Sequence, residues 1–181
     1  MKFALKIILL ITFVFSIDYE CLSAQRFLYI LNDDCLNELS ESAENYFKKT
    51  QISVIRDSRG IILRLEIKNP AKEYSKFSPE FYTNIINIEH FLAKIKNPAI
   101  IEVHTENISS QKDFGIKNWE MSTVIANRIE ELMLKMGKEC LRGRINSIGY
   151  GEFLPSKNTS NNGGAYPNRV DIIILCNISG E

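Results

Sequence analysis

Three carboxylates fall around one polar segment of the chain, and paired carboxylates are the groups that acid–base catalysis uses. Glu106, Asp113 and Glu120 lie between a short apolar stretch and a long amphipathic one. Two acids held at a fixed separation can cleave a glycosidic bond, yet a solvated loop has the same composition. His90 and His104 have no nucleophile pattern near them in the sequence, so no catalytic triad is indicated. The sequence therefore predicts a protein that is not an enzyme.

The cysteine, histidine and glycine spacings do not indicate a metal ion or a cofactor. No CxxC pair and no Cys/His cluster with zinc-ligand spacing is present. Gly163-Gly164 lacks the strand and helix that flank a phosphate-binding loop. The 22 basic and 22 acidic residues give a net charge of zero, whereas nucleic-acid-binding proteins carry a basic surplus or stripe. We expect no metal, no cofactor and no nucleic-acid partner.

The first 24 residues are typical of a targeting segment. Lys2 and Lys6 precede the apolar run Ile7–Ile17, which has the length of a signal-peptide core and is short for a membrane-spanning helix. Cleavage after Ala24 would release residues 25–181. An uncleaved anchor and lipidation at Cys21 are the alternatives, and either would attach the protein to a membrane. In each case the rest of the chain is exported.

Three cysteines follow this segment, and an oxidising compartment would allow a disulfide between two of them. Cys140 precedes a predicted strand and Cys176 ends another. If those strands pair antiparallel, a Cys140–Cys176 bridge could form. The alternative is that Cys35, Cys140 and Cys176 are all buried small apolar residues.

Apolar periodicity predicts helices and strands along the rest of the chain. Within an N-terminal helical segment at 25–50, Asn32-Asp33-Asp34 could cap a helix that ends near Phe47. Ser78-Pro79 opens a second helix, which stops at Asn97-Pro98. Asn118 caps a third, which Gly137 closes. Strands are expected at Gln51–Asp57, Ile61–Ile67, Ala99–His104, Arg144–Ile148 and Val170–Cys176. Asn69-Pro70 is interpreted as the end of the Ile61–Ile67 strand, and Gly149–Pro167 as a loop.

The last of these strands is nearly all apolar, so it should be central or covered on both faces. Helices that alternate with strands of this length are typical of a two-layer arrangement. The predicted fold is an α+β sandwich in which the helices pack on one face of a mixed sheet.

Five motif blocks lie in a fixed order in the second half of the chain. They are Val103-His104-Thr105-Glu106, Asn118-Trp119-Glu120-Met121-Ser122, Gly137 with Arg144-Ile145, Gly149-Tyr150-Gly151-Glu152-Phe153-Leu154-Pro155, and Asn168-Arg169-Val170-Asp171-Ile172. Their order and spacing resemble those of the OmpA/MotB-like C-terminal domain family, and the second block is similar to a segment of flagellar-stator MotB proteins. The resemblance covers residues 51–177. It implies an OmpA-like sandwich and a periplasmic module that grips peptidoglycan.

The resemblance also implies a binding site. Diaminopimelate in the peptidoglycan stem peptide carries an ammonium and a carboxylate, which an anion and a cation held close together would bind. The family supplies an Asp after the third strand and an Arg in the next helix, together with a helix N-terminus that favours anions. The matching positions in this chain are Thr105, Glu106, Asn118 and Arg169.

The chain departs from the family pattern where the cation should be. Glu106 takes the position of the Asp, and Ile125 takes the position of the Arg. A charged hydrogen bond contributes about 1.5–3 kcal/mol, so its loss would weaken binding roughly ten- to hundred-fold. Arg128, about one turn further along the helix, could act as a compensating cation. Its other interpretation is an ordinary solvated helix charge.

The resemblance and these departures leave two expectations for function. The first is an exported envelope protein that associates with peptidoglycan and anchors or positions an envelope assembly. The second is a structural subunit of a secretion or motility machine, for example the type IVB (Dot/Icm) apparatus, with weakened or lost peptidoglycan binding. Both imply a periplasmic location, attached to the outer or inner membrane if the N-terminus is retained, and partners among envelope proteins.

Overall fold

The computed structural model describes residues 33–105, 117–137, 140–153 and 168–176. The predictions for the targeting segment, for Glu106 and Asp113, and for Gly163-Gly164 lie outside these residues. The elements are α2 (Asp33–Phe47), β1 (Ser53–Asp57), β2 (Gly60–Glu66), α3 (Pro70–Ser75), α4 (Pro79–Lys94), β3 (Ala99–His104), α5 (Asn118–Gly137), β4 (Ile145–Gly151) and β5 (Arg169–Leu175). No helix in the described ranges is both long and apolar enough to cross a membrane.

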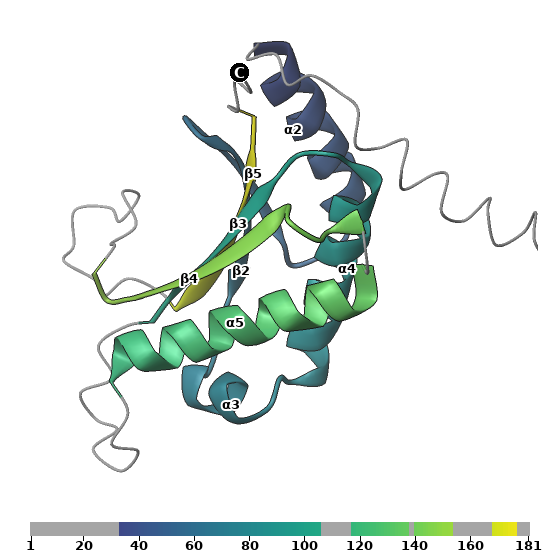
Figure 1. Cartoon of the computed structure of the whole chain (residues 1–181). Coiled ribbons are helices and arrows are strands. Elements are labelled where there is room, and N and C mark those ends of the chain that lie inside the picture. Colours follow the sequence, from purple (N-terminus) through teal and green to yellow (C-terminus); the bar gives the residue numbers. More distant parts are fainter. Residues whose placement is uncertain (1–32, 106–116, 138–139, 154–167, 177–181) are drawn as a thin grey trace, which may run out of the picture.

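The strands form one mixed sheet, as predicted. Its order is β1-β2-β5-β3-β4, in which β3 and β4 are parallel and the other neighbours are antiparallel. The apolar strand β5 lies between β2 and β3 (Figure 1), and its residues are buried from Arg169 to Ile174. This confirms the prediction of a central final strand.

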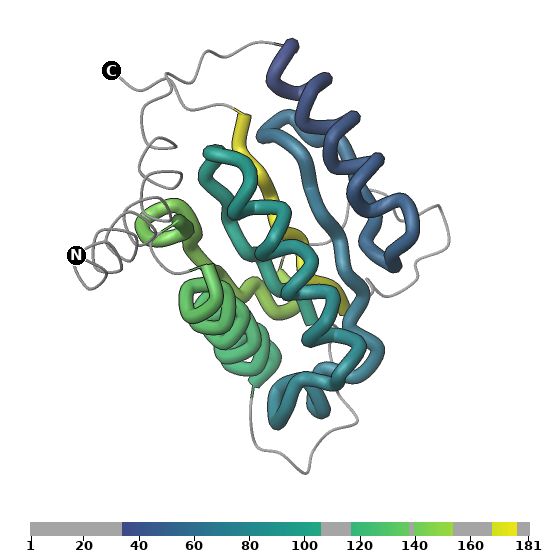
Figure 2. The backbone as a smooth tube through the Cα atoms, turned by 90° about the vertical axis from the view of Figure 1, so that its right-hand side faces the viewer, coloured from purple at the N-terminus to yellow at the C-terminus, as the bar shows by residue number. Residues whose placement is uncertain are grey.

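The helices α2, α4 and α5 cover one face of the sheet, with β5 behind them (Figure 2). One hydrophobic core fills the space between the two layers. It includes Phe47 of α2, Ile85, Ile88 and Leu92 of α4, Ile125 and Ile129 of α5, and Ile61, Leu63, Ile101, Ile172 and Ile174 of the sheet. The α+β sandwich with helices on one face is therefore confirmed.

Successive strand residues point to opposite faces, so the residues between these core positions point away from the helices. This second face, here called the polar face, carries Arg64, Glu102, His104, Arg169 and Asp171. Arg64 is directly opposite Asp171 on β5, and Glu102 is opposite it on β3. All of these side chains except Arg64 are buried, so the register brings charged groups together in a desolvated layer.

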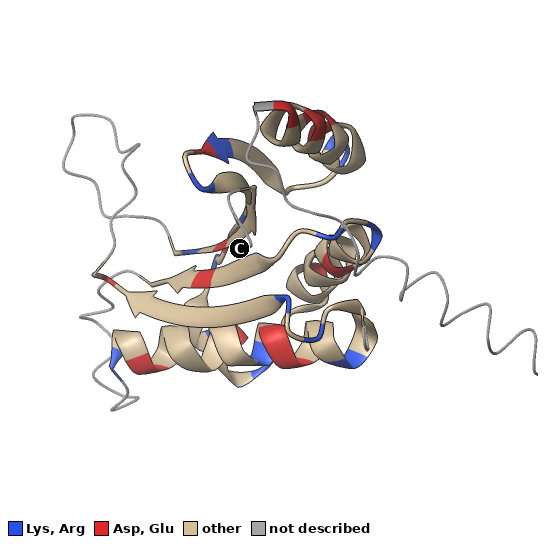
Figure 3. Cartoon of the chain, turned by 45° about the horizontal axis from the view of Figure 1, so that its top comes forward, with Lys and Arg blue, Asp and Glu red and all other residues tan. Residues whose placement is uncertain are grey.

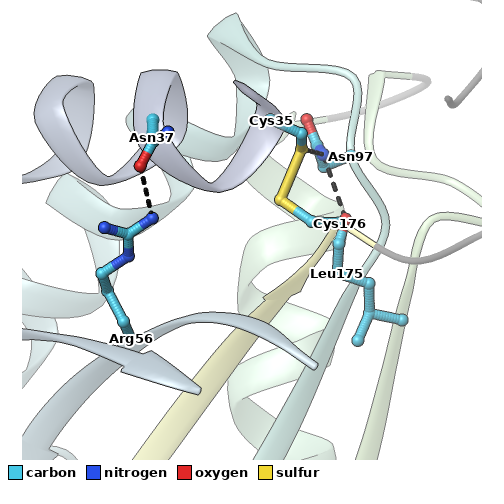
Figure 4. Close-up of a disulfide and its surroundings, with 6 residues drawn as sticks. All are labelled: Cys35, Asn37, Arg56, Asn97, Leu175 and Cys176. Carbon is cyan, nitrogen blue, oxygen red and sulfur yellow. Dashed lines mark hydrogen bonds between the residues drawn. A yellow bond between two sulfur atoms is a disulfide. The ribbon is translucent and has the colours of Figure 1, made fainter. Parts of the chain in front are cut away.

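The predicted N-terminal helix forms and is part of the same core. Leu39, Ala43 and Phe47 of α2 are buried, and the Phe47 ring lies 5.2 Å from that of Phe91 on α4. At the polar edge of α2, Arg56 donates a 2.7 Å hydrogen bond to Asn37 (Figure 4). Helix α2 is therefore packed into the domain and is not a separate flanking segment.

The predicted Cys140–Cys176 bridge is wrong. Cys176 forms a disulfide with Cys35 at the start of α2, with a Cα–Cα distance of 6.1 Å (Figure 4). The strand that follows Cys140 is β4, which lies at the sheet edge, two strands away from β5. The packing of α2 brings Cys35 to the end of β5, and the Asn97 amide donates to the Leu175 carbonyl beside the bridge.

Strand β2 ends at Glu66, before Asn69-Pro70, as predicted. The same pair also starts the short helix α3, because the Asn69 side chain accepts a hydrogen bond from the Lys72 N–H at 3.0 Å. The predicted loop at Gly149–Pro167 begins later than expected. Strand β4 runs to Gly151, since a register shift at Val103/His104 lets its last residues keep pairing with β3.

Candidate functional site

The motif residues meet where β3 and β4 end and α5 begins. Thr105 follows β3 directly, and its hydroxyl donates to the carbonyl of Asn118 at 3.1 Å. The Thr105 N–H donates to the carbonyl of Gly151 at 3.0 Å. Thr105 is 2% exposed, so both bonds are shielded from water. One threonine thus joins the ends of two parallel strands to the first residue of the helix.

A second buried contact holds α5 against β4. The Gly151 N–H donates to the Ser122 hydroxyl at 2.9 Å, and that hydroxyl donates to the Trp119 carbonyl at 2.9 Å. A Cβ placed on Gly149 would lie 2.2 Å from the Thr123 nitrogen, so the helix backbone touches the strand there. Ser122 and Gly149 therefore fix the position of the helix N-terminus relative to Thr105.

The four residues Thr105, Asn118, Ser122 and Gly151 come from three motif blocks separated in sequence, and the fold brings them together. Glu106, the expected anion, lies outside the described residues. Asn118 is half-buried at the helix start, where N–H groups without intrahelical partners favour an anion. The sequence prediction of a site at this junction rests on Thr105, Glu106 and Asn118, and the structure brings the first and third into contact.

Arg169 forms an ion pair on the polar face. Its Nε donates to Asp171 at 2.9 Å, and its side chain is 4% exposed. Asp171 also receives two hydrogen bonds from Arg64, at 2.7 and 2.8 Å. Burial raises the pKa of the Asp171 carboxyl, but the bonds from Arg64 and Arg169 hold it below its ordinary value of 3.8. The carboxylate is thus ionised and shared by two guanidinium groups.

Arg128, on α5, binds the neighbouring helix α3. Its guanidinium donates to the carbonyls of Glu73 and Tyr74, at 3.1 and 2.5 Å, and lies 4.5 Å from the centre of the Phe77 ring. These contacts satisfy carbonyls of the last turn of α3. A role for Arg128 as a compensating cation would require that these contacts break.

Ile125, at the family's Arg position, is fully buried and belongs to the core. Its neighbour Ala126 is also fully buried. A charge at this point would have to be desolvated, which is costly without a partner. The structure thus uses this helix position for the core.

A second group of polar residues on the polar face was missed by the sequence interpretation. The buried ring of His104 stacks on Tyr150, with ring centres 5.2 Å apart. Its Nε2 lies 3.7 Å from Glu102, whose carboxylate accepts a 2.8 Å hydrogen bond from Arg59. Burial and the charge of Glu102 raise the pKa of Tyr150, and Arg59 partly offsets them. The sequence feature that could have indicated this group is Glu102, a single charged residue in a strand that is otherwise largely apolar.

The described ranges contain no group of three His, Cys, Asp or Glu side chains placed to hold a metal ion. A cleft of about 620 Å³ lies between β1–β2 and α3–α4, with Lys68, Lys72, Glu73, Glu80 and Asn84 among its lining residues. None of Thr105, Asn118 and Arg169 lines it. Basic and acidic residues alternate along α5 (Figure 3), which is the mixed charge of a solvated helix face rather than a basic stripe.

Comparison with solved structures identifies the fold. A putative MotB-like protein from Desulfovibrio vulgaris has a TM-score of 0.62 and 21% identity, covering 80% of this chain and 93% of that one. The cell wall anchor of the T6SS from Pseudomonas aeruginosa has a TM-score of 0.57 and 20% identity, covering 76% and 96%. The periplasmic domain of Helicobacter pylori MotB has a TM-score of 0.55 and 17% identity, covering 70% and 82%.

No protein-family model matches this sequence, and a search of curated proteins finds no match either. The likeness is therefore one of three-dimensional structure at low sequence identity. The chain has the OmpA/MotB-like fold, the fold of MotB periplasmic domains and of a cell wall anchor. The resemblance that the five motif blocks predict is confirmed at this level.

Proposed function

We propose that this protein is an exported, non-enzymatic envelope component that associates weakly with the peptidoglycan stem peptide and thereby positions an envelope assembly. The observation that carries the proposal is the convergence of Thr105, Asn118, Ser122 and Gly151 at the N-terminus of α5. Thr105 directly precedes Glu106 in the sequence and contacts the first residue of α5. A stem peptide supplies both a carboxylate and an ammonium, which would bind the helix terminus and Glu106 respectively.

The binding is weak in this proposal because the cations that could replace the family's Arg are engaged. Ile125 is in the core, Arg128 binds carbonyls of α3, and Arg169 binds Asp171. The same three observations favour the alternative function, a structural subunit of a secretion or motility machine that keeps the fold and has lost peptidoglycan binding. In both cases we infer a periplasmic location and protein partners in the envelope, with the N-terminus as the element that could attach the chain to a membrane.

A sedimentation assay with purified sacculi at low salt distinguishes the two functions. The wild-type protein should sediment with sacculi, and Glu106→Ala should abolish this because it removes the only group proposed to hold the ammonium. Glu131→Ala is the matched control, since Glu131 is an exposed carboxylate further along α5. Circular dichroism should show all three proteins equally folded. A wild-type protein that stays in the supernatant would overturn the anchor function and favour the alternative.

A further inference from the structure

Two large aromatic side chains stand exposed beside the proposed stem-peptide site. Trp119, in the first turn of α5, is 46% exposed, and Phe153, just after β4, is 73% exposed. By contrast, Phe47, Phe81 and Phe91 are all buried in the core. An aromatic ring that remains in water adds little to the stability of the fold, so these two rings are free to contact another molecule.

The two backbone segments that carry the rings touch at Gly151. A Cβ on Gly151 would lie 2.9 Å from the nitrogen of Trp119, so strand end and helix start touch there. Two residues later, the Phe153 N–H donates to the Tyr150 carbonyl at 3.1 Å and closes a turn around Gly151. Gly151 also accepts the hydrogen bond from Thr105. Trp119 and Phe153 therefore belong to the two segments that meet at the proposed site.

Charged residues neighbour both rings in the sequence. Lys117 and Glu120 border Trp119 and form a local cap, in which the Lys117 N–H donates to the Glu120 carboxylate at 3.0 Å. Glu152 precedes Phe153 and is exposed. Helix α5 and strand β4 also expose Val124 and Ile148, so apolar and charged side chains are mixed on the two elements that carry the rings.

We propose that Trp119 and Phe153 form a stacking platform for a sugar ring of the peptidoglycan glycan strand. The proposal rests on the proposed function and extends it from the stem peptide to the glycan. The flat face of a pyranose ring presents C–H groups, which the negative face of an aromatic ring attracts, while the hydroxyl groups stay in water. The stem peptide is covalently joined to the glycan and spans at most about 3.5 Å per residue. A peptide bound at the N-terminus of α5 therefore brings a sugar close to these rings.

The experiment compares two probes, a synthetic stem peptide with diaminopimelate and the same peptide linked to its disaccharide. Trp119 is the only tryptophan in the chain, so its fluorescence reports directly on the platform. The sugar-containing probe should shift the emission to shorter wavelength and bind roughly tenfold or more tightly than the peptide alone, as expected for two stacking contacts. The peptide alone should leave the emission nearly unchanged.

Variants test whether the rings cause this difference. Phe153→Ala keeps the tryptophan signal, and Trp119→Ala is followed by calorimetry; each should weaken binding of the sugar-containing probe and leave binding of the peptide unchanged. Tyr82→Ala is the matched control, because Tyr82 is an aromatic residue on α4 that is 40% exposed. Thermal unfolding should verify that each variant folds.

The outcomes distinguish this inference from the proposed function. If the wild type binds both probes equally, or the variants lose both probes equally, the sugar platform is overturned while stem-peptide binding stands. If the wild type binds neither probe, the proposed function and the platform fail together.

Discussion

Asp171 is the residue on which the polar face depends most. Its carboxylate is 5% exposed, accepts bonds from Arg64 and Arg169, and lies 4.0 Å from His104. Removing one partner of a buried charge network leaves the others uncompensated, which costs more than the network contributes as a whole. The site prediction assigned Arg169 to the ligand, and in the structure its Nε donates to this carboxylate.

We expect Asp171→Ala to lower the free energy of unfolding by about 3–5 kcal/mol, because it leaves two guanidinium groups without their shared anion. Urea unfolding followed by circular dichroism measures the loss. The control is Glu80→Ala, which removes the exposed Lys68–Glu80 pair on α4 and should cost less than about 1 kcal/mol. Equal losses in the two variants would contradict the role of Asp171.

The same variant should show a specific pH dependence. The pKa of Asp171 is lower in the folded protein than its ordinary value of 3.8, so the unfolded chain binds the proton more readily. The stabilisation is therefore complete above that value and decreases as the pH falls below it. The difference in the free energy of unfolding between the wild type and Asp171→Ala should become smaller as the pH falls. A difference that becomes larger in acid would contradict this explanation.

At the scale of elements, the contact of α5 with β4 decides the shape of the candidate site. Two features fix the position of the N-terminus of α5 against β4. Ser122 accepts a hydrogen bond from Gly151, and the lack of a side chain at Gly149 lets the helix backbone approach the strand. Backbone atoms of Thr123 fill the position that a Cβ on Gly149 would take. The helix cannot shift without moving Asn118 relative to Thr105.

Gly149→Ala should lower stability by roughly 1–3 kcal/mol through overpacking against the helix backbone, and it should weaken sedimentation with sacculi as well. Gly143→Ala is the control, because a Cβ there meets no atom within 4 Å, although its φ of +72° adds strain of about 1–2 kcal/mol. Unfolding and sacculus binding are measured for both variants. Sacculus binding that is intact in Gly149→Ala would show that the helix position does not matter for the site.

Local patterns predicted most of the elements. Apolar residues at helical spacing from Met121 to Met133 predicted α5, and the all-apolar run from Val170 predicted a central strand, since both patterns depend only on neighbouring residues. Helix α3 could have been predicted too, because Asn69-Pro70 is the same cap-and-proline start that Ser78-Pro79 shows for α4.

Contacts between distant segments could not be predicted in this way. Arg64 and Asp171 face each other only because β5 pairs with β2 in a particular register, and neither strand reveals that order. Arg128 reaches α3, whose packing against α5 is a tertiary feature. Part of the site was predictable because its residues fall in motif blocks. The hydrogen bonds of Arg128 to α3 and of Arg169 to Asp171 were not predictable from the sequence.

At the scale of the whole molecule, α2 extends the domain beyond the residues that carry the motifs. The helix contributes Leu39, Ala43 and Phe47 to the common core, and the Cys35–Cys176 disulfide joins it to the end of β5. The two cysteines are 141 residues apart in sequence. A cross-link over so long a loop restricts the unfolded chain strongly.

Cys35→Ser should therefore lower the free energy of unfolding by about 2–5 kcal/mol in the absence of reductant. Thermal and urea unfolding by circular dichroism measure the change. Asn37→Ala is the control on the same helix, since it removes only the exposed bond to Arg56 and should cost less than about 1.5 kcal/mol. If Cys35→Ser unfolds with the wild-type midpoint, the disulfide does not contribute to stability.

The disulfide also decides how the domain would respond to mechanical tension. A pull applied at Cys35 passes through the sulfur atoms to Cys176 and so to β5, which is hydrogen-bonded along both edges by β2 and β3. Helix α2 cannot be peeled away first, because the covalent path bypasses it. A load that enters at Cys35 is therefore transferred to the two strand ladders of β5.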